Sequence, residues 1–94
     1  MSYCVYILEC ADGSYYVGHT DDLEARLAEH NRGRAATHTA LRLPVALAYT
    51  EPAASRPAAA EREKQIKRWS RAKKKALIRG DKQALKTLSR RRRR

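Results

Sequence analysis

Arg26 and His30 carry side chains that together could act on a phosphate group. They are four residues apart, so on a helix they lie on the same side, one turn from each other. His30 also falls in the angular sector of Leu23 and Leu27, which turns it toward the interior. A guanidinium beside a group that moves protons near neutral pH suits a scissile phosphate. The competing interpretation is an inward histidine that makes only a structural hydrogen bond.

Glu63 is a carboxylate at a position where the pattern predicts core. Residues 59, 63, 66 and 70 form one helical stripe, which is occupied by Ala59, Glu63, Ile66 and Ser70. An unpaired charge there is costly, so the carboxylate either pairs with an Arg or Lys side chain or holds a hard cation. Both alternatives stay open at this level. Glu61 lies off the stripe and is expected at the surface.

Tyr6 and Tyr16 are expected on facing strands of a β-hairpin, whose register decides whether they share a face. A two-residue turn at Asp12 and Gly13 would point the two rings to opposite sides. A three-residue loop, with Gly13 in the left-handed conformation, would place Tyr6 opposite Gly18 and both rings on one face. Gly18 would then leave space above the backbone for a ligand. Alternatively, both rings are ordinary tyrosines that cover a sheet.

The chain is strongly basic, with 21 Lys and Arg residues against 10 Asp and Glu residues, a formal charge of +11 and a pI near 10.3. Such a charge favours polyanionic partners, nucleic acid first among them. Basic residues occupy nearly every non-apolar position around Trp69, which is interpreted either as core packing or as a platform for stacked bases. The residues expected to contact nucleic acid here are Lys64, Lys67, Arg68, Arg71 and Lys74.

Other classes of function are disfavoured. The sequence contains no 18-residue apolar run, signal peptide or lipidation motif, so we expect no membrane association and a cytoplasmic location. Cys4 and Cys10 lie six residues apart in one predicted strand, too far for a disulfide, and they suit a reducing compartment. His19, His30 and His38 lack the spacing typical of a zinc site.

Local patterns predict an α+β fold with a three-stranded, mainly antiparallel sheet flanked by helices. The predicted strands cover residues 3–10, 14–18 and 44–50, and the predicted helices cover residues 21–32, 55–70, 71–79 and 81–88. Residues 34–43 are expected to form a loop, in which Thr37, His38 and Thr39 are candidate phosphate contacts.

One domain is expected over residues 1–80, because so short a chain supports only a thin core. A basic extension follows at residues 81–94. Its last five residues, Arg90 to Arg94, carry like charges that repel one another, so part of the extension is expected to be disordered when no partner is bound.

At these positions the chain resembles the GIY-YIG nuclease superfamily, most closely its short single-domain bacterial members of the UPF0213 type. The resemblance extends over about residues 3–80. Cys4-Val5-Tyr6 stands where the family has Gly-Ile-Tyr, and Tyr16-Val17-Gly18 stands where it has Tyr-Ile-Gly. The pair of Arg26 and His30 and the helical Glu63 follow in family order. The resemblance implies a three-stranded antiparallel sheet with flanking helices and a single Mg²⁺ or Mn²⁺ ion held by the glutamate.

Carried over residue by residue, the resemblance makes Glu63 the metal ligand, Arg26 the clamp on the phosphate and Tyr6 a candidate base for the attacking water. Tyr16 and His30 would orient water and phosphate or relay protons. A cation and a guanidinium would neutralise the charge that develops on the phosphorane.

The function expected from these features is metal-dependent endonuclease activity on phosphodiester bonds in DNA, in repair or processing. DNA is preferred to RNA as the partner. Because no additional domain is expected, the protein would either be weakly specific or depend on a partner protein for specificity. His19 stands where DNA-repair members typically carry lysine, so it is expected to contact nucleic acid. The alternative is a catalytically inactive module that binds DNA or structured RNA.

Overall fold

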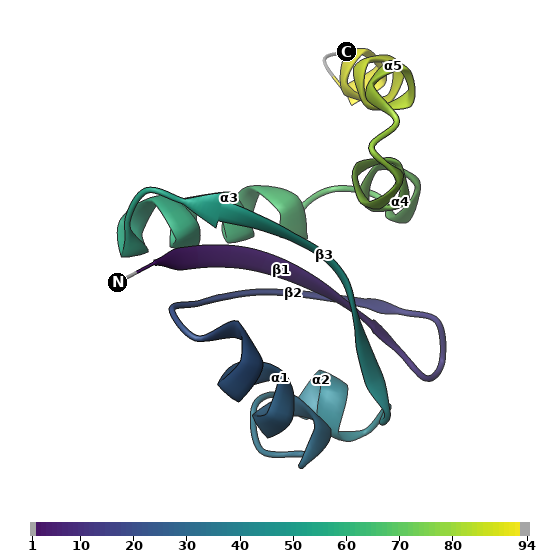
Figure 1. Ribbon diagram of the computed structural model, residues 1–94. Coiled ribbons are helices and arrows are strands. Elements are labelled where there is room, and N and C mark those ends of the chain that lie inside the picture. Colours follow the sequence, from purple (N-terminus) through teal and green to yellow (C-terminus); the bar gives the residue numbers. More distant parts are fainter. Residues whose placement is uncertain (1, 93–94) are drawn as a thin grey trace.

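A three-stranded antiparallel sheet with the strand order β2-β1-β3 lies between two groups of helices (Figure 1). The computed structural model describes the backbone of residues 2–92 and the side chains of residues 2–89. In chain order the elements are β1 (Tyr3–Cys10), β2 (Tyr15–Thr20), α1 (Leu23–Asn31), α2 (Thr37–Ala40), β3 (Val45–Ala53), α3 (Arg56–Lys67), α4 (Arg71–Arg79) and α5 (Lys82–Arg92). The predicted α+β class, with its antiparallel sheet and flanking helices, is confirmed.

The hairpin between β1 and β2 has the three-residue loop. Gly13 adopts a φ of 85°, and the backbone of Cys10 accepts from Gly13 and donates to Ser14 at 2.9 and 2.8 Å. A left-handed residue at this point suits glycine, which has no Cβ to clash. In the resulting register Tyr6 lies opposite Gly18. The structure thereby decides between the two registers that the sequence left open.

The two faces of β1 bury alternate residues against different helices. Val5 and Ile7 belong to a core cluster with Ile66 of α3, and they are fully buried. Tyr6 and Leu8 point to the opposite face, where α1 and α2 lie (Figure 1). This alternation follows from the two-residue period of a strand. Because β2 is an edge strand, groups from both helical layers can meet beside it.

Polar side chains cap the first turns of α1 and α3. Asp22 accepts from the backbone of Ala25 at 3.1 Å at the start of α1, and Ser55 accepts from the backbone of Ala58 at 3.2 Å at the start of α3. The predicted helix 55–70 ends earlier, at Lys67, because Ser70 caps the next helix by accepting from the backbone of Lys73. Residues 34–43 were expected to form a loop, but α2 lies within them.

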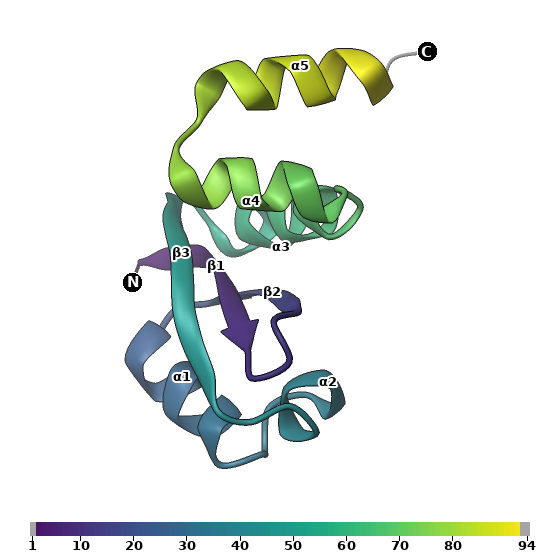
Figure 2. The same cartoon turned by 90° about the vertical axis from the view of Figure 1, so that its right-hand side faces the viewer.

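The helix α5 lies on the side of α4 that faces away from the sheet (Figure 2). Leu85 of α5 packs against the cluster of Val5 and Ile7. The helix continues to Arg92, beyond the predicted limit of residue 88, and its backbone includes Arg90 to Arg92 of the charge run. Arg93 and Arg94 lie outside the described residues. Within residues 2–92, no helix combines the length and apolar character needed to cross a membrane.

Candidate active site

A polar pocket of about 240 Å³ lies beside β2, where the two helical layers meet. Its wall includes Tyr6 from β1, Tyr16 and His19 from β2, Arg26 from α1 and Glu63 from α3. These are five of the residues singled out in the sequence, and they are separated by up to 57 positions along the chain (63 − 6 = 57). These side chains can come together because β2 is the edge strand, beside which residues from the helices on both faces of the sheet can reach one pocket.

His30 lies behind the pocket, not in its wall. It is 1% exposed, and its Nε2 atom is 2.9 Å from the Tyr6 hydroxyl. Its Nδ1 atom is 2.9 Å from Oγ1 of Thr39. The inward orientation expected from its helical position is confirmed. The ring of Tyr16 packs edge-on against the His30 ring, with 5.1 Å between centroids, so both tyrosines of the pocket touch this histidine.

Thr39 is fully buried, so its predicted role as a phosphate contact is wrong. Its hydroxyl donates to the backbone carbonyl of Ala36 at 3.1 Å and contacts His30 as described. A polar sequence with no clear period gave no sign that this residue reaches the interior. The neighbouring Thr37 is exposed, at the start of α2.

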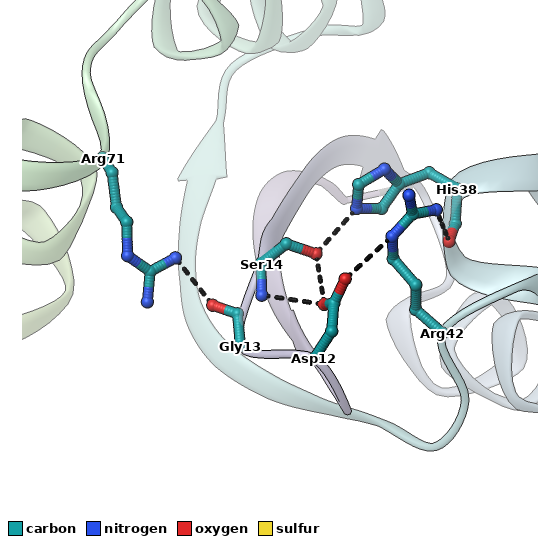
Figure 3. A network of polar contacts seen from close by, with 6 residues as sticks. All are labelled: Asp12, Gly13, Ser14, His38, Arg42 and Arg71. Atoms are coloured by element: carbon teal, nitrogen blue, oxygen red, sulfur yellow. Dashed lines mark hydrogen bonds and ion pairs between the residues drawn. The ribbon is translucent and has the colours of Figure 1, made fainter.

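His38 is tied to the hairpin turn by a network of polar contacts (Figure 3). The hydroxyl of Ser14 donates to Asp12 at 2.7 Å, so Nε2 of His38, 2.9 Å away, is the donor to Ser14. Arg42 binds Asp12 at 2.9 Å and the carbonyl of His38 at 3.0 Å. The network holds the turn against α2 and keeps the His38 ring stacked on Tyr16, 6.1 Å between centroids.

Burial sets the protonation of the Tyr6 and His30 pair. Desolvation, with the neighbouring Tyr16 as a second cause, raises the pKa of Tyr6 well above its ordinary value of 10.0. Desolvation followed by the charge of Arg26 lowers the pKa of His30 below its ordinary value of 6.5. Both effects disfavour the charged forms. At neutral pH the pair therefore consists of a phenol and a neutral imidazole.

The depressed pKa of His30 makes folding stability pH-dependent. The unfolded chain takes up a proton near pH 6.5, whereas the folded chain resists it until lower pH. The free energy of unfolding should then be level above about pH 6.5 and fall below it, with a slope of up to about 1.4 kcal/mol per pH unit from this group. Urea unfolding at a series of pH values measures this slope. In a His30→Gln variant the free energy of unfolding should vary less with pH between pH 6.5 and the range where carboxylates titrate. An unaltered slope would contradict the assignment of this pH dependence to His30.

Gly18 provides the space that the Tyr6 ring occupies. A Cβ atom at this position would collide with the Tyr6 hydroxyl and lie 2.6 Å from its Cζ atom. The backbone of Gly18 has no left-handed φ, so the requirement is one of room and not of conformation. The glycine of the hairpin is therefore explained by the close approach of the tyrosine.

Gly18→Ala is expected to destabilise the fold by about 1–3 kcal/mol, because the Tyr6 ring must move out of its place between Gly18 and His30. Thermal or urea unfolding measures the loss. In a Tyr6→Ala background the same substitution should cost much less, since the colliding ring is gone. Equal costs in both backgrounds would show that the glycine serves another purpose.

Glu63 pairs with two basic groups in the pocket. Its Oε1 atom is 2.6 Å from Nδ1 of His19, and its Oε2 atom is 2.7 Å from Nζ of Lys67. Burial alone would raise the pKa of this carboxyl, but the hydrogen bonds from Lys67 and His19 outweigh it and hold the pKa below its ordinary value. Glu63 is therefore ionised at neutral pH. His19, expected from the sequence to contact nucleic acid, lies against this carboxylate.

The pocket offers a divalent cation the ionised carboxylate of Glu63. Within residues 2–92, no group of three or more His, Cys, Asp and Glu side chains could hold a metal ion. Mg²⁺ often keeps several waters and binds through one or two carboxylates together with substrate phosphates. The ionised Glu63, with 18% of its side chain exposed in a polar pocket, fits that mode of binding. A cation on Oε2 would compete with Lys67.

Arg26 is exposed and lines the pocket. Among the residues that the structure describes, no side chain forms a hydrogen bond or ion pair with its guanidinium. A guanidinium presents donors in a fork that matches phosphate. Arg26 is therefore available for an anionic ligand in the pocket.

The basic residues predicted to contact nucleic acid fall into two groups. Lys67 is at the pocket, where it pairs with Glu63. Burial, followed by the charge of Lys67, lowers the pKa of Lys74. Arg71 donates to the carbonyl of Gly13 at 2.6 Å, as Figure 3 shows. Of these three cations, Lys67 pairs with Glu63 of the pocket, Lys74 is close enough to Lys67 to feel its charge, and Arg71 reaches the hairpin turn.

The second group is on another part of α3. Lys64 and Arg68 line a separate hollow of about 400 Å³ together with Trp69. Trp69 is half-buried and packs against the core, with Arg62 and Lys73 over its ring at 5.2 and 4.0 Å. Of the two interpretations of Trp69, core packing is the observed one.

The chain is similar to proteins of one known family. The family model of the GIY-YIG catalytic domain matches residues 2–76. A UPF0213 protein of Halobacterium salinarum is 51% identical over 74 residues, covering 79% of this chain and 96% of that protein. A UPF0213 protein of Staphylococcus aureus is 46% identical over 77 residues, covering 82% of this chain and 94% of that protein.

Two solved structures have the same fold. The solution structure of a UPF0213 protein from Bacillus halodurans superimposes with a TM-score of 0.55 at 40% identity, covering 86% of each chain. The solution structure of a protein from E. faecalis gives a TM-score of 0.59 at 36% identity, covering 85% of each chain. The fold, the catalytic-domain match over residues 2–76 and the relatives of similar length agree. The chain therefore belongs to the GIY-YIG nuclease superfamily and to its short single-domain UPF0213 group.

Proposed function

We propose that this protein is a divalent-metal-dependent endonuclease that hydrolyses phosphodiester bonds in DNA. The observation that carries the proposal is the convergence of the ionised Glu63, the available guanidinium of Arg26 and the hydroxyl of Tyr6 on one pocket. Phosphodiester hydrolysis requires a carboxylate that can hold a cation, a guanidinium that can bind a phosphate and a group that transfers a proton.

Bound at Glu63, a Mg²⁺ or Mn²⁺ ion would supply positive charge that stabilises the phosphorane and the leaving oxygen. Arg26 would hold a non-bridging oxygen of the phosphate and neutralise charge from the other side. With that clamp and one ion, two sources of positive charge act on the reacting phosphate.

Tyr6 would accept the proton of the attacking water while it passes its own proton to Nε2 of His30, 2.9 Å away. The water oxygen forms the new bond to phosphorus, and the bond to the leaving oxygen breaks. This coupled transfer matters because the raised pKa of Tyr6 makes a free phenolate costly at neutral pH. Tyr16, packed against His30 and His38, would orient the water and the phosphate.

Lys67, Lys74 and Arg71 would hold the phosphates that flank the scissile one. Lys67 is bound to Glu63 of the pocket, Lys74 lies within reach of the charge of Lys67, and Arg71 is at the hairpin turn. Contacts of this kind position a nucleic acid without reading its sequence. Nicked, flapped or single-stranded DNA suits the shallow pocket, since its wall is shared by β1, β2, α1 and α3 and does not present one helix to a DNA groove. A partner protein would supply further specificity, and the two free cysteines, Cys4 and Cys10, suit a reducing compartment such as the cytoplasm.

A second candidate function is a catalytically inactive module that binds DNA or structured RNA. The observation in its favour is that Lys67 and His19 already compensate the charge of Glu63 without a metal ion. The basic surface would serve such a module equally well.

The test is cleavage of end-labelled single-stranded, nicked and branched DNA, with matched RNA, in Mg²⁺, in Mn²⁺ and in a chelator. Cleavage of DNA that the chelator abolishes would support the nuclease. Binding without cleavage in either metal would favour the inactive module, and cleavage confined to RNA would contradict DNA as the substrate.

A further inference from the structure

Thr39 lies at the end of a buried chain of hydrogen bonds that begins at the pocket. The chain runs from the hydroxyl of Tyr6 to Nε2 of His30, and from Nδ1 of His30 to Oγ1 of Thr39, with 2.9 Å for each step. It ends where the Thr39 hydroxyl meets the carbonyl of Ala36 at 3.1 Å. Tyr6 is 2% exposed, His30 1% and Thr39 0%, so water does not interrupt the chain at these residues.

The last contact sets the direction of all the others. A carbonyl oxygen only accepts, so the single hydroxyl proton of Thr39 is donated to Ala36. Oγ1 of Thr39 can then contact Nδ1 of His30 only as an acceptor, which places the ring proton on Nδ1. A neutral imidazole has one ring proton, so Nε2 is left with its lone pair and accepts from Tyr6.

We propose that Thr39 is a positioning residue that fixes the Nδ1-protonated tautomer of His30 and thereby makes Nε2 the acceptor of the Tyr6 proton. The role in catalysis rests on the proposed function, whereas the tautomer is a property of the resting protein. With the proton on Nε2 instead, His30 would donate to Tyr6 and could not take its proton. Thr39 touches neither substrate nor metal in this scheme, and it acts only through His30.

The hydrogen bonds of Thr39 also suit the charged form of His30. After the proton has moved from Tyr6 to Nε2, both ring nitrogens carry protons. The Nδ1 proton still has Oγ1 of Thr39 as its acceptor, and the Thr39 hydroxyl still has Ala36 as its own. Oγ1 of Thr39 therefore offers a lone pair to the imidazolium, in a place where burial would otherwise disfavour a charge.

Thr39→Val and Thr39→Ser distinguish the effect of the Thr39 hydroxyl from the effect of side-chain volume. Valine has the shape of threonine without the donor and acceptor, and serine keeps both. Thr37→Val is the matched control, because Thr37 is exposed at the start of the same short helix. The full chain, labelled with ¹⁵N in histidine, gives the protonation of each ring nitrogen by NMR at a pH where His30 is neutral. The His30 signals are identified by their loss in His30→Gln.

The wild type, Thr39→Ser and Thr37→Val should show the proton on Nδ1, and Thr39→Val should show it moved wholly or partly to Nε2. A wild-type spectrum with the proton on Nε2, or an Nδ1 proton that persists in Thr39→Val, would overturn the proposal. Should Thr39→Val fail to fold, the spectra of the wild type and of Thr39→Ser still decide the tautomer.

Cleavage kinetics test the consequence. Thr39→Val should lower kcat by about 10–100-fold with little change in KM, as expected for a group that orients a catalytic residue, and Thr39→Ser should restore most of kcat. A loss of the same size in Thr39→Ser would overturn the positioning role, because serine keeps the hydroxyl on which that role depends. If the wild type cleaves nothing, the proposed function fails, while the spectra still test the tautomer independently.

Discussion

Glu63→Gln is expected to abolish metal-dependent cleavage, with a fall in kcat on the order of 10³-fold or more. A bound cation contributes several kcal/mol to the stabilisation of the transition state, and about 1.4 kcal/mol corresponds to a factor of ten in rate. Glutamine keeps the size of the side chain and an oxygen for His19 or Lys67, but it loses the negative charge that binds the cation. Gel assays under single-turnover conditions, in Mg²⁺ and in Mn²⁺, measure the effect.

Glu61→Gln is the matched control for this change. It removes the same charge from the same helix, but Glu61 is exposed and lies outside the pocket. Binding of a labelled DNA in the absence of metal should differ little between the two variants, because each raises the net charge by one. Equal cleavage by Glu63→Gln and Glu61→Gln would refute the role of Glu63 as metal ligand, and with it the nuclease mechanism given above.

Tyr6→Phe is expected to lower kcat by about 10²–10⁴-fold, the usual contribution of a proton-transfer group. The substitution keeps the ring that packs over Gly18 and removes only the hydroxyl, so the loss reports the chemistry more than the fold. It also removes the partner of His30 Nε2, so His30 has no proton to receive. Single-turnover rates across a range of pH measure the change.

Tyr15→Phe provides the comparison for that result. Tyr15 is on β2, next to Tyr16, and packs against the core on the other face of the sheet, with Arg71 over its ring at 4.4 Å. Its loss of a hydroxyl should leave cleavage within a few-fold of the wild type. A Tyr6→Phe variant as active as Tyr15→Phe would mean that hydroxide from solvent or metal attacks without help from Tyr6.

The regular elements were largely predictable because their signals are local. Ser55 and Gly80 mark helix ends through contacts or conformations within a few residues, and each stands at a helix end that the sequence predicted. The inward orientation of His30 follows from its spacing to Leu23 and Leu27 on one helix. A pattern of this kind requires only the period of the element and the types of its residues.

The hairpin register lay at the limit of what the sequence could decide. Asp12 and Gly13 suit both a two-residue turn and the end of a three-residue loop. The contact between Tyr6 and Gly18 belongs to the longer loop, and it becomes visible only when the strands are paired. Strand pairing with β3 and the packing of α1 and α3 on opposite faces supply the constraint that the turn residues lack.

The sequence by itself determined the composition of the fold, the basic character of the surface and the position of a carboxylate on the core-facing stripe of α3. Only the tertiary structure decided which partners that carboxylate has and where Thr39 lies. His19 reaches Glu63 across 44 positions, and Thr39 comes from a polar segment that has no periodic pattern. Contacts of this range depend on how whole elements pack, and no local spacing encodes them.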